Sequence, residues 1–470
     1  MSSQLHLLSL LCYGPLAVLI VTSSDNVLAE EASAQKGYEL LLNKPYVESA
    51  FDQETFDEVW QSWEEPLRSK AATASPDDRR RMAYRRYGFV ERPDDPGHRP
   101  IQYVVDDQGK WSMNCLACHQ GTVAGELIPG AANTQFALQT LVEDIRTTKL
   151  RLRKPLSGLD IGSSFFPLGT TVGTTNAIMF GVALMHYRDE DLNVLSNRLP
   201  PKLTHHDHDA PAWWNTAIKE RLYCDNFAPR GHRALMQFIA SKENGPEKFR
   251  EWEDDFRHIQ AYIESLEPPK YPVEIDQPLA EQGRGVFNEN CASCHGTYDP
   301  KIELSEQYPE RIIDWSVVKT DPVRLGSLTV EHRAGYGRNW INEYGEAGEV
   351  IADPQGYLAP PLTGVWASAP YLHNGSVPTL WHLLNPEKRS MVWVRRCRSP
   401  LQGPKTDYDF EKIGLAVEAL EHLPAKELPK AETRYYFDTR KFGKSAGGHD
   451  FPSVLDERQR KAVLEYLKTL

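Results

Sequence analysis

Apolar residues recur along the chain with the three- and four-residue spacing of amphipathic helices. This spacing predicts helices over residues 35–43, 53–63, 77–87, 134–153, 247–266 and 455–470. Residues 174–187 are apolar on most sides, which predicts a buried helix. Residues 101–105 and 110–113 alternate around a turn at Gly109, which predicts a hairpin. The pattern therefore predicts a mainly α fold with little β.

Proline interrupts this pattern at two places. Pro155 cannot continue the helix before it, so we expect residues 155–168 to be loop. Pro268-Pro269, followed by Tyr271-Pro272, predicts a rigid linker. We therefore expect an N-terminal domain over residues 30–268 and a C-terminal domain over residues 269–470. Most of residues 296–450 are rich in Gly and Pro, which predicts long loops.

The first thirty residues differ from the rest of the chain. Residues 5–21 are almost uncharged and rich in Leu, and Val27-Leu28-Ala29 resembles a small-residue cleavage site. This pattern predicts a signal peptide over residues 1–29, with a retained anchor helix as the alternative. No later segment is apolar enough to span a membrane. We therefore expect a periplasmic or secreted protein with no stable membrane insertion after cleavage.

Composition and charge narrow the class of protein. Hydrophobic residues make up 40% of the 470 residues and charged residues 25%, as in globular proteins. Lys and Arg number 53 against 65 Asp and Glu, a net charge of −12. Since nucleic-acid binding requires clustered basic side chains, we expect no nucleic-acid partner.

Two short motifs carry the candidate chemistry. Cys115-Leu116-Ala117-Cys118-His119 and Cys291-Ala292-Ser293-Cys294-His295 both read C-x-x-C-H, the attachment pattern of c-type haem. In this pattern the two cysteines form thioethers with the haem and the histidine binds the iron. A zinc site would need a second ligand pair nearby, and a thioredoxin-like pair would need a βαβ context. We therefore predict two covalently attached haem c groups in two c-type cytochrome domains.

The remaining cysteines of the mature chain, Cys224 and Cys397, leave two alternatives open. They form a disulfide in an oxidising compartment, or both are buried thiols.

The second ligand of each iron determines what the haem can do, because an open face binds oxygen or peroxide. No histidine follows closely after His119, and Met113, Met179, Met185 and His186 are candidates by type alone. We favour an open face on the first haem. The pair Trp213-Trp214, with Phe227, lines that face or packs in the core.

The second haem has three candidate ligands in the sequence. His449, just before the terminal helix, is the one we favour, with Met391, His373 or no protein ligand as alternatives. The run His205-His206-Asp207-His208-Asp209 resembles a metal cluster, but adjacent positions rarely converge on one ion. We expect that run to be a solvated loop.

Several segments resemble one family. Residues 359–380 resemble the segment shared by bacterial di-haem cytochrome c peroxidases and the methylamine-utilisation di-haem maturase. Residues 448–451 and 465–470 make the chain most similar to the rubber oxygenase-like branch. The resemblance also covers residues 114–119, 130–133, 211–214 and 271–295.

This resemblance implies roles for individual residues. His119 would be the proximal ligand of a reactive haem, with Trp213 or Trp214 and Phe227 near its distal face. His295 and His449 would ligate a relay haem, and His373 would be a partner of a propionate or a water. Peroxidases usually place a histidine shortly after the first motif, and this chain does not, which argues against the reductively activated scheme. Outside the matching segments the chain differs enough from rubber oxygenase to make polymer cleavage doubtful.

Two functions remain as alternatives from the sequence. The first is an exported di-haem oxidoreductase in which the first haem reacts with peroxide or oxygen and the second relays electrons. Its partner would be a small redox protein or a quinol-linked electron donor or acceptor. The second is an electron-transfer protein with two six-coordinate haems. In either case, loops at residues 296–360 could dock a partner.

Overall fold

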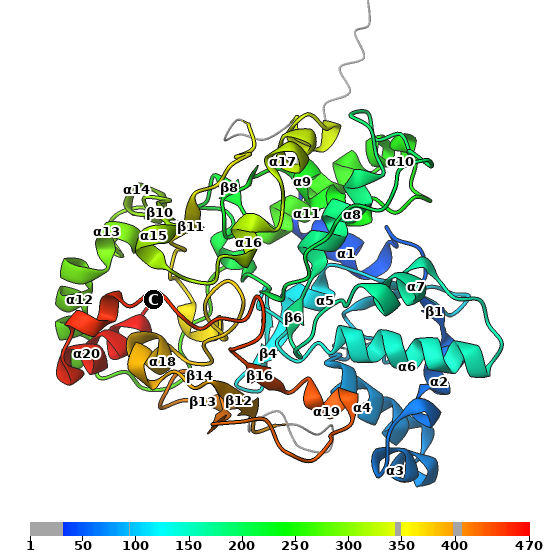
Figure 1. Cartoon of the computed structure of the whole chain (residues 1–470), viewed down its shortest axis with the longest axis horizontal. Coiled ribbons are helices and arrows are strands. Elements are labelled where there is room, and N and C mark those ends of the chain that lie inside the picture. Colours follow the sequence, from blue (N-terminus) through cyan, green and yellow to red (C-terminus); the bar gives the residue numbers. More distant parts are fainter. Residues whose placement is uncertain (1–31, 94, 344–348, 398–406) are drawn as a thin grey trace, which may run out of the picture. The chain divides into compact units, whose positions relative to one another are not determined.

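The N-terminal half is built from helices around a small sheet (Figure 1). The computed structural model describes residues 32–93, 95–343, 349–397 and 407–470. The predicted signal peptide lies outside these residues. Most helices predicted for this half are confirmed, two of them as interrupted pairs. They are α1 (Ala34–Asn43), α2 (Gln53–Asp57) with η1 (Val59–Ser62), α4 (Pro76–Tyr87), α6 (Leu138–Arg151), and α10 (Pro246–Glu251) with α11 (Glu253–Glu264).

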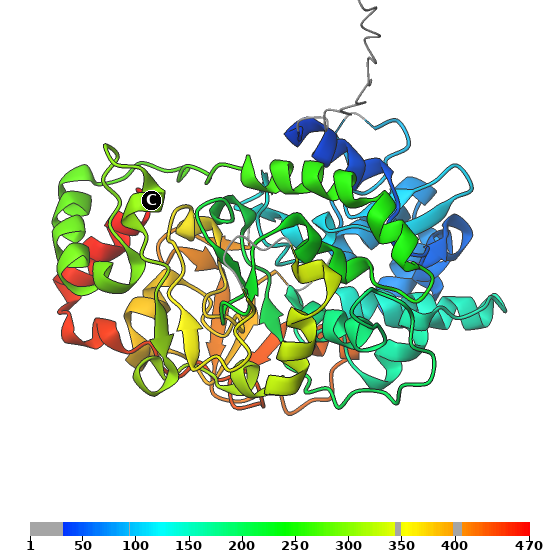
Figure 2. The same ribbon diagram turned by 90° about the horizontal axis from the view of Figure 1, so that it is seen from above.

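The C-terminal half contains two long helices, α12 (Gln277–Asn290) and α20 (Glu457–Leu467). Asp456 begins α20 with a capping box, because its carboxylate accepts from the Gln459 backbone while the Gln459 side chain accepts from the Asp456 backbone. The two helices lie against each other in Figures 1 and 2. Their approach is so close that a Cβ on Gly283 would lie 1.9 Å from the carbonyl oxygen of Ala462.

A second pair of helices crosses in the same way. A Cβ on Gly37 of α1 would lie 2.0 Å from the carbonyl oxygen of His258 in α11. Figure 2 shows α1 beside α11, far from the pair α12 and α20. Each half of the chain therefore contains a helix pair whose contact depends on a glycine, and each pair is separated in sequence by one C-x-x-C-H motif.

Short helices fill the rest of the described chain. The α-helices are α3 (Leu67–Thr73), α5 (Leu116–His119), α7 (Gly158–Phe165), α8 (Ala177–His186), α9 (His232–Leu235), α13 (Ala292–His295), α14 (Leu304–Gln307), α15 (Trp315–Val318), α16 (Val323–Gly326), α17 (Val330–Gly337), α18 (Leu380–Leu384) and α19 (Lys430–Thr433). The further 3₁₀ turns are η2 (Trp213–Asn215), η3 (Met236–Ile239), η4 (Trp340–Asn342), η5 (Val365–Ala367), η6 (Pro386–Lys388) and η8 (Phe451–Val454).

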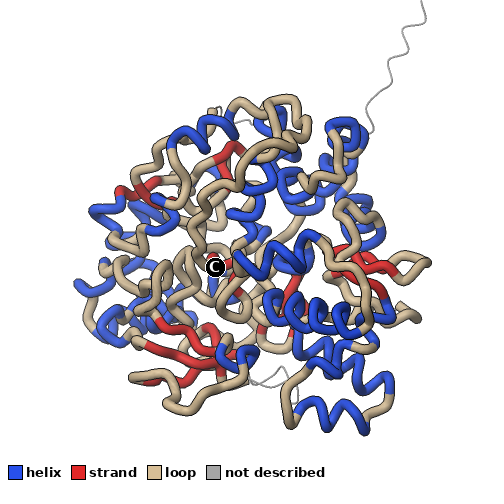
Figure 3. Tube along the Cα trace, turned by 45° about the vertical axis from the view of Figure 1, so that its right-hand side comes forward, coloured by secondary structure: helices blue, strands red, loops and turns tan. Residues whose placement is uncertain are grey.

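The strands are short and scattered, as the red segments of Figure 3 show. One antiparallel sheet has the order β1-β3-β2, another β15-β12-β16, and the others are two-stranded. The strands are β1 (Phe51–Asp52), β2 (Tyr103–Val105), β3 (Lys110–Met113), β4 (Gln120–Val123), β5 (Glu126–Pro129), β6 (Thr174–Thr175), β7 (His208–Asp209), β8 (Arg221–Leu222), β9 (Ala228–Pro229), β10 (Ile312–Asp314), β11 (Gly356–Leu358), β12 (Val392–Arg395), β13 (Tyr408–Asp409), β14 (Gly414–Leu415), β15 (Val417–Leu420) and β16 (Tyr436–Asp438). The predicted hairpin is confirmed, since Tyr103 pairs with Met113.

One of the two expectations about the loops was wrong. Residues 155–168 contain α7, because Ser157 accepts from the Asp160 backbone and opens a new helix just after Pro155. The described part of residues 296–450 is mostly loop, as expected, and its helices and strands are short. In α8, predicted to be buried, only Met179, Gly181 and Met185 are buried.

The core consists of separate hydrophobic clusters. One joins α12, α20 and residues 365–380, and includes Trp214 and Phe287. Another joins α1, α11 and η3, and includes Trp213 and Phe227. Ser33–Leu470 nevertheless form one compact unit. Within the described residues, no helix is long and apolar enough to cross a membrane.

Candidate functional site

The first motif follows directly after the hairpin strand β3. Asn114 anchors it by donating from Nδ2 to the carbonyls of Leu41 and Ile101, both at 2.8 Å, and by accepting from the Leu116 backbone. Cys115 then begins α5, and the helix ends at His119. The Nδ1 of His119 donates to the carbonyl oxygen of Pro211 at 3.1 Å.

The second motif follows the long helix α12. Cys291 ends α12 and begins α13, which ends at His295. The Nδ1 of His295 donates to the carbonyl oxygen of Pro360 at 2.9 Å. Both motif histidines therefore use Nδ1 in the same way, toward a proline carbonyl from a distant part of the chain.

This hydrogen bond fixes the chemistry of each imidazole. A carbonyl can only accept, so Nδ1 carries the proton and the lone pair of Nε2 remains for a metal. Burial also lowers the pKa of His119 to about 4, and it lowers the pKa of His295. Both rings are therefore neutral near pH 7, the form that binds iron.

The motif cysteines suit thioether attachment better than a thiolate site. Cys115, Cys118, Cys291 and Cys294 are half-buried, and no disulfide joins them. Burial raises the pKa of Cys115 and Cys291 to about 11 and that of Cys118 to about 12, which disfavours thiolates. In the described part of the chain, no three His, Cys, Asp or Glu side chains are placed to hold a metal ion.

No disulfide forms between the other two cysteines, Cys224 and Cys397. Of the two alternatives that the sequence left open, the structure therefore has two thiols.

The structure brings His449 to face His295. The ring centroids lie 6.1 Å apart, with 62° between the ring planes. An iron bonded to both rings at about 2 Å from each nitrogen would separate their centroids by about 6 Å. Burial, and then the nearby His295, lower the pKa of His449 to about 3, so this ring is also neutral. Both histidines could therefore bind the iron of one haem.

Arg389 holds the segment that carries His449. Its guanidinium donates to the carbonyls of Ala446 at 2.8 Å, of Gly448 at 2.6 Å and of His449 at 3.3 Å. The backbone N–H of His449 donates to the carbonyl of Val318 at 2.7 Å. The position of His449 is thus fixed through its backbone, and Nδ1 of its ring is buried without a hydrogen-bond partner.

The first motif has no such opposing histidine among the described residues. The aromatic ring in contact with His119 is that of Trp213, which stacks at 4.5 Å with 17° between the planes. His186 lies elsewhere, with Nε2 bonded to the carbonyl of Leu199 at 3.0 Å. A ring stacked flat on the motif histidine lies on the proximal side, whereas the resemblance implied the distal face for Trp213 or Trp214.

The indoles of Trp213 and Trp214 enter different clusters, although they are adjacent in sequence. Trp213 packs in the cluster that Cys115 contacts, and Trp214 in the cluster that Cys291 contacts. Trp214 donates from Nε1 to the carbonyl of Thr363 at 2.8 Å, and Asn215 donates to the same carbonyl at 3.1 Å. We call residues 211–215 together with residues 360–364 the seam.

Gly364 is required at the seam. It has φ +66°, and a Cβ at this position would lie 2.6 Å from Nε1 of Trp214. Because Pro211 and Pro360 belong to the same two segments, the seam orients both motif histidines and joins the two clusters.

The other predicted site residues lie apart from the motif histidines. Phe227 is buried beside Tyr336, with ring centroids 4.9 Å apart. His373 stacks on Tyr357 at 4.3 Å, and burial lowers its pKa to about 3. Met391 is 49% exposed, so of the three candidate ligands His449 alone contacts the His295 ring.

The expected solvated loop at residues 205–209 was wrong. His206, Asp207 and His208 are 2%, 1% and 4% exposed. Lys444 pairs with Asp207 at 2.9 Å, and the rings of His206 and His208 lie 4.5 Å apart. The run is buried because its charged residue finds a partner more than two hundred residues later in the chain.

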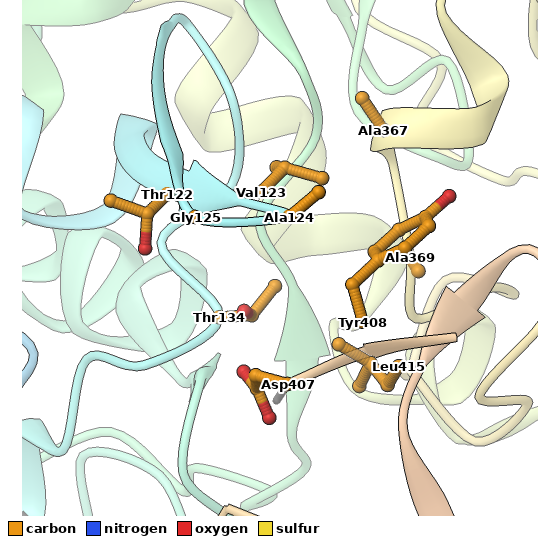
Figure 4. Close-up of a pocket in the computed structure, with 10 residues that line it drawn as sticks. All are labelled: Thr122, Val123, Ala124, Gly125, Thr134, Ala367, Ala369, Asp407, Tyr408 and Leu415. Atoms are coloured by element: carbon orange, nitrogen blue, oxygen red, sulfur yellow. The ribbon is translucent and has the colours of Figure 1, made fainter. Parts of the chain in front are cut away.

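A small cavity of about 20 Å³ lies between β4 and the segment that resembles the di-haem family. Figure 4 shows Val123 and Ala124 on one side of it, Tyr408 and Ala369 on the other, and Asp407 with Thr134 below. A cavity of this size holds about one water molecule. Oδ1 of the buried Asp407 has no hydrogen-bond partner in the structure.

Sequence reasoning did not identify Pro211, Pro360 or Arg389 as functional residues. The two prolines stand in segments that the resemblance did cover, but the resemblance gave no role to their carbonyls. Arg389 lies outside every motif, and no signal in the sequence marks it.

Comparison with known proteins finds two relatives in Sinorhizobium fredii (strain NBRC 101917 / NGR234). The uncharacterized protein y4iM is 30% identical over 240 residues, which cover 45% of this chain and 53% of that protein. The uncharacterized protein y4iJ is 28% identical over 267 residues, which cover 44% of this chain and 41% of that protein. The chain thus matches about half the length of these curated relatives.

A family model matches part of the C-terminal half. Residues 356–394 match the model described as RoxA-like, cytochrome c-like. These residues include Pro360, Thr363 and Gly364 of the seam, as well as Arg389. The match supports a RoxA-like cytochrome family, and its cytochrome c-like domain implies covalently bound haem c.

Proposed function

We propose that this chain is an exported di-haem c-type cytochrome oxidoreductase. Cys115, Cys118 and His119 would hold a haem that supplies chemistry with peroxide or oxygen, and Cys291, Cys294 and His295 would hold a haem that supplies electron relay. The observation that carries the proposal is an asymmetry: a second imidazole, that of His449, faces His295, and none among the described residues faces His119.

The likeness of the two motifs supports the presence of two haems. Each motif histidine donates from Nδ1 to a proline carbonyl, and each motif lies between two helices that cross at a glycine. Such outer hydrogen bonds fix the tautomer and orientation of a metal-binding histidine.

Haem c supplies one-electron redox chemistry and, where its iron has an open position, binding of oxygen or peroxide. The chain determines which of these each site performs. His449 and His295 would together hold the iron at the second motif, which would limit that site to electron transfer. His119 would hold the iron at the first motif, where no second imidazole among the described residues faces it and a small ligand could bind.

The seam offers an electron route between the two sites. Trp213 stacks on His119, and the adjacent Trp214 is bonded to Thr363, three residues after the Pro360 that orients His295. Reduction of one peroxide to two waters consumes two electrons and two protons. We propose that a small redox protein or a quinol-linked donor supplies the electrons through the second site.

Low-temperature EPR of the fully oxidised protein tests the proposal. We expect one high-spin and one low-spin ferric haem, and binding of cyanide at the high-spin site alone. Two low-spin haems, neither of which opens on half-reduction, would instead identify an electron-transfer cytochrome without a reactive site. A haem content of one per chain would overturn the di-haem assignment.

A further inference from the structure

Two arginines and one aspartate form a buried cluster outside the motifs. Asp225 accepts from Nη1 of Arg333 at 2.9 Å and from Nη2 of Arg324 at 3.3 Å, and Nε of Arg324 lies 3.0 Å from the same carboxylate. All three side chains are fully buried, with an exposed fraction of 0%. We call Asp225, Arg324 and Arg333 the arginine cluster.

The arginine cluster has more positive than negative charge. Within the described residues, Asp225 is the one carboxylate at ion-pair distance from either guanidinium. Nη1 of Arg324 and both Nε and Nη2 of Arg333 are buried without a hydrogen-bond partner. A buried charge without a partner costs several kcal/mol, so the cluster as it stands lacks an anion.

The neighbouring side chains do not supply that anion. The imidazoles of His206, His208 and His373 all lie close enough to Arg324 for its charge to help lower their pKa values, after the larger effect of burial. These rings are neutral. Phe227 lies below the Arg333 guanidinium, with its ring centroid 5.0 Å from Cζ. The surroundings are thus apolar or neutral on the described sides.

Residues packed against the arginine cluster or close to it in sequence also contact residues of both candidate haem sites. Phe227 belongs to the hydrophobic cluster of Trp213, against which Cys115 packs. On the other side, Arg324 follows the segment whose Val318 carbonyl accepts from the His449 backbone.

We propose that Arg324 and Arg333 bind a propionate carboxylate of one of the two haems. The inference rests on the proposed haem binding and extends it to residues outside the C-x-x-C-H motifs. A planar guanidinium with two free N–H groups matches a carboxylate by parallel hydrogen bonds. One propionate would neutralise the excess charge and satisfy the unpaired donors, while the other propionate is not assigned.

The test compares three variants of the complete protein, loaded with haem. Arg333→Gln removes the charge, Arg333→Lys keeps the charge but not the planar pair of donors, and Arg338→Gln is a control that removes an exposed arginine next to the same helix. The measurements are the resonance Raman band of propionate bending and the midpoint potential of each haem, separated by their spin-state signals.

We expect Arg333→Gln to shift the propionate band and to favour the ferric state of one haem. At fixed applied potential, the ratio of ferric to ferrous haem should rise about tenfold, a fall in midpoint potential of ~59 mV for one electron. Arg333→Lys should shift the Raman band with little change in potential, and Arg338→Gln should change neither.

The spin state of the affected haem identifies the source of the propionate. A shift at the low-spin haem assigns it to the second motif, and a shift at the high-spin haem to the first. Unchanged bands and potentials in both Arg333 variants, each with two haems, would overturn the inference and leave the proposed function intact. If Arg333→Gln does not retain both haems, the Raman band of Arg333→Lys alone tests the inference. A shifted propionate band supports it, and an unchanged band overturns it.

Discussion

At the residue scale, the proton on Nδ1 of each motif histidine determines what the motif can bind. His119 and His295 each give this proton to a carbonyl from a proline far away in sequence. The motifs themselves could be recognised from the spacing of their residues. Their carbonyl partners could not, because a backbone acceptor leaves no mark on residue type.

His449 offers the first prediction at this scale. Replacing it by Ala removes the ring that faces His295 at 6.1 Å, so the second haem should change from low-spin to high-spin or to a form that binds added ligands. The measurement is optical and EPR spectroscopy of the oxidised protein. His98→Ala, at a half-exposed histidine, should leave both haem spectra as they are.

An unchanged low-spin signal in His449→Ala would remove His449 as a ligand. Met391 and His373 would not then become stronger candidates, because one is half-exposed and the other stacks on Tyr357.

The raised pKa of Asp407 gives a prediction of how the stability of the protein depends on pH. Burial outweighs the attraction of Arg395 and raises the pKa of Asp407 to about 6. The folded protein therefore binds this proton more tightly than the unfolded chain, and stability falls as the pH rises from about 4 through about 6. Asp407→Asn should remove this loss, which amounts to about 2–3 kcal/mol at pH 7.

The measurement is the melting temperature of both proteins at pH 4 and pH 7. The variant should gain a few degrees relative to the natural chain at pH 7 and little at pH 4. Asp353→Asn, at an exposed carboxylate, serves as the control. A gain of equal size at both pH values would show that the proton of Asp407 has no part in it.

At the scale of elements, the crossing of α12 and α20 depends on one position. Gly283 faces the Ala462 carbonyl, whereas Gly285 on the same helix has no atom within 4 Å of the place where a Cβ would stand. The two glycines therefore differ only in what surrounds them.

Ala substitutions at the two positions should have opposite effects. Gly283→Ala forces the helices apart and should cost about 1–3 kcal/mol. Gly285→Ala should stabilise the protein by about 0.5–1 kcal/mol, because alanine is the better helix former. Thermal unfolding of both variants measures this difference, and equal effects would contradict the close crossing.

The sequence predicts those helices and hairpins whose periodicity, caps and turn residues all lie within one short segment. The helices at residues 34–43 and 76–87 and the hairpin at Tyr103–Met113 follow from periodicity and turn residues. Periodicity does not predict α7, because Pro155 ends the helical pattern, although Ser157 and Asp160 form a new cap just after it. The burial of His206 and His208 depends on Lys444, a partner that no local pattern contains.

At the scale of the whole molecule, the seam links the two candidate haem sites. It consists of hydrogen bonds from Trp214 and Asn215 to the carbonyl of Thr363, with a return bond from the Thr363 hydroxyl to Asn215. The resemblance pointed to both segments, but their contact is a property of the folded chain.

Trp214→Phe tests the seam as a route between the sites. The variant leaves the Thr363 carbonyl with Asn215 as its donor and should cost about 0.5–1.5 kcal/mol of stability, the net value of one hydrogen bond. Electron transfer between the haems should slow, while the spectrum of each haem stays the same. Rapid-mixing absorption spectroscopy follows the two haems separately.

Trp60→Phe, at a tryptophan of a different hydrophobic cluster, is the matched control. Transfer at the original rate in Trp214→Phe, with stability reduced as expected, would mean that electrons take another path.

The seam also limits how this protein can be recombined with its relatives. The Pro268-Pro269 linker is the obvious crossover point for a chimaera that joins the first half of one protein to the second half of another. Such a chimaera inherits Trp214 and Asn215 from one parent and Thr363 and Gly364 from the other. Gly364 admits no side chain beside the indole, so mismatched parents would misplace the carbonyls that orient both motif histidines at once. A functional chimaera therefore has to exchange residues 211–215 and 360–364 as one unit.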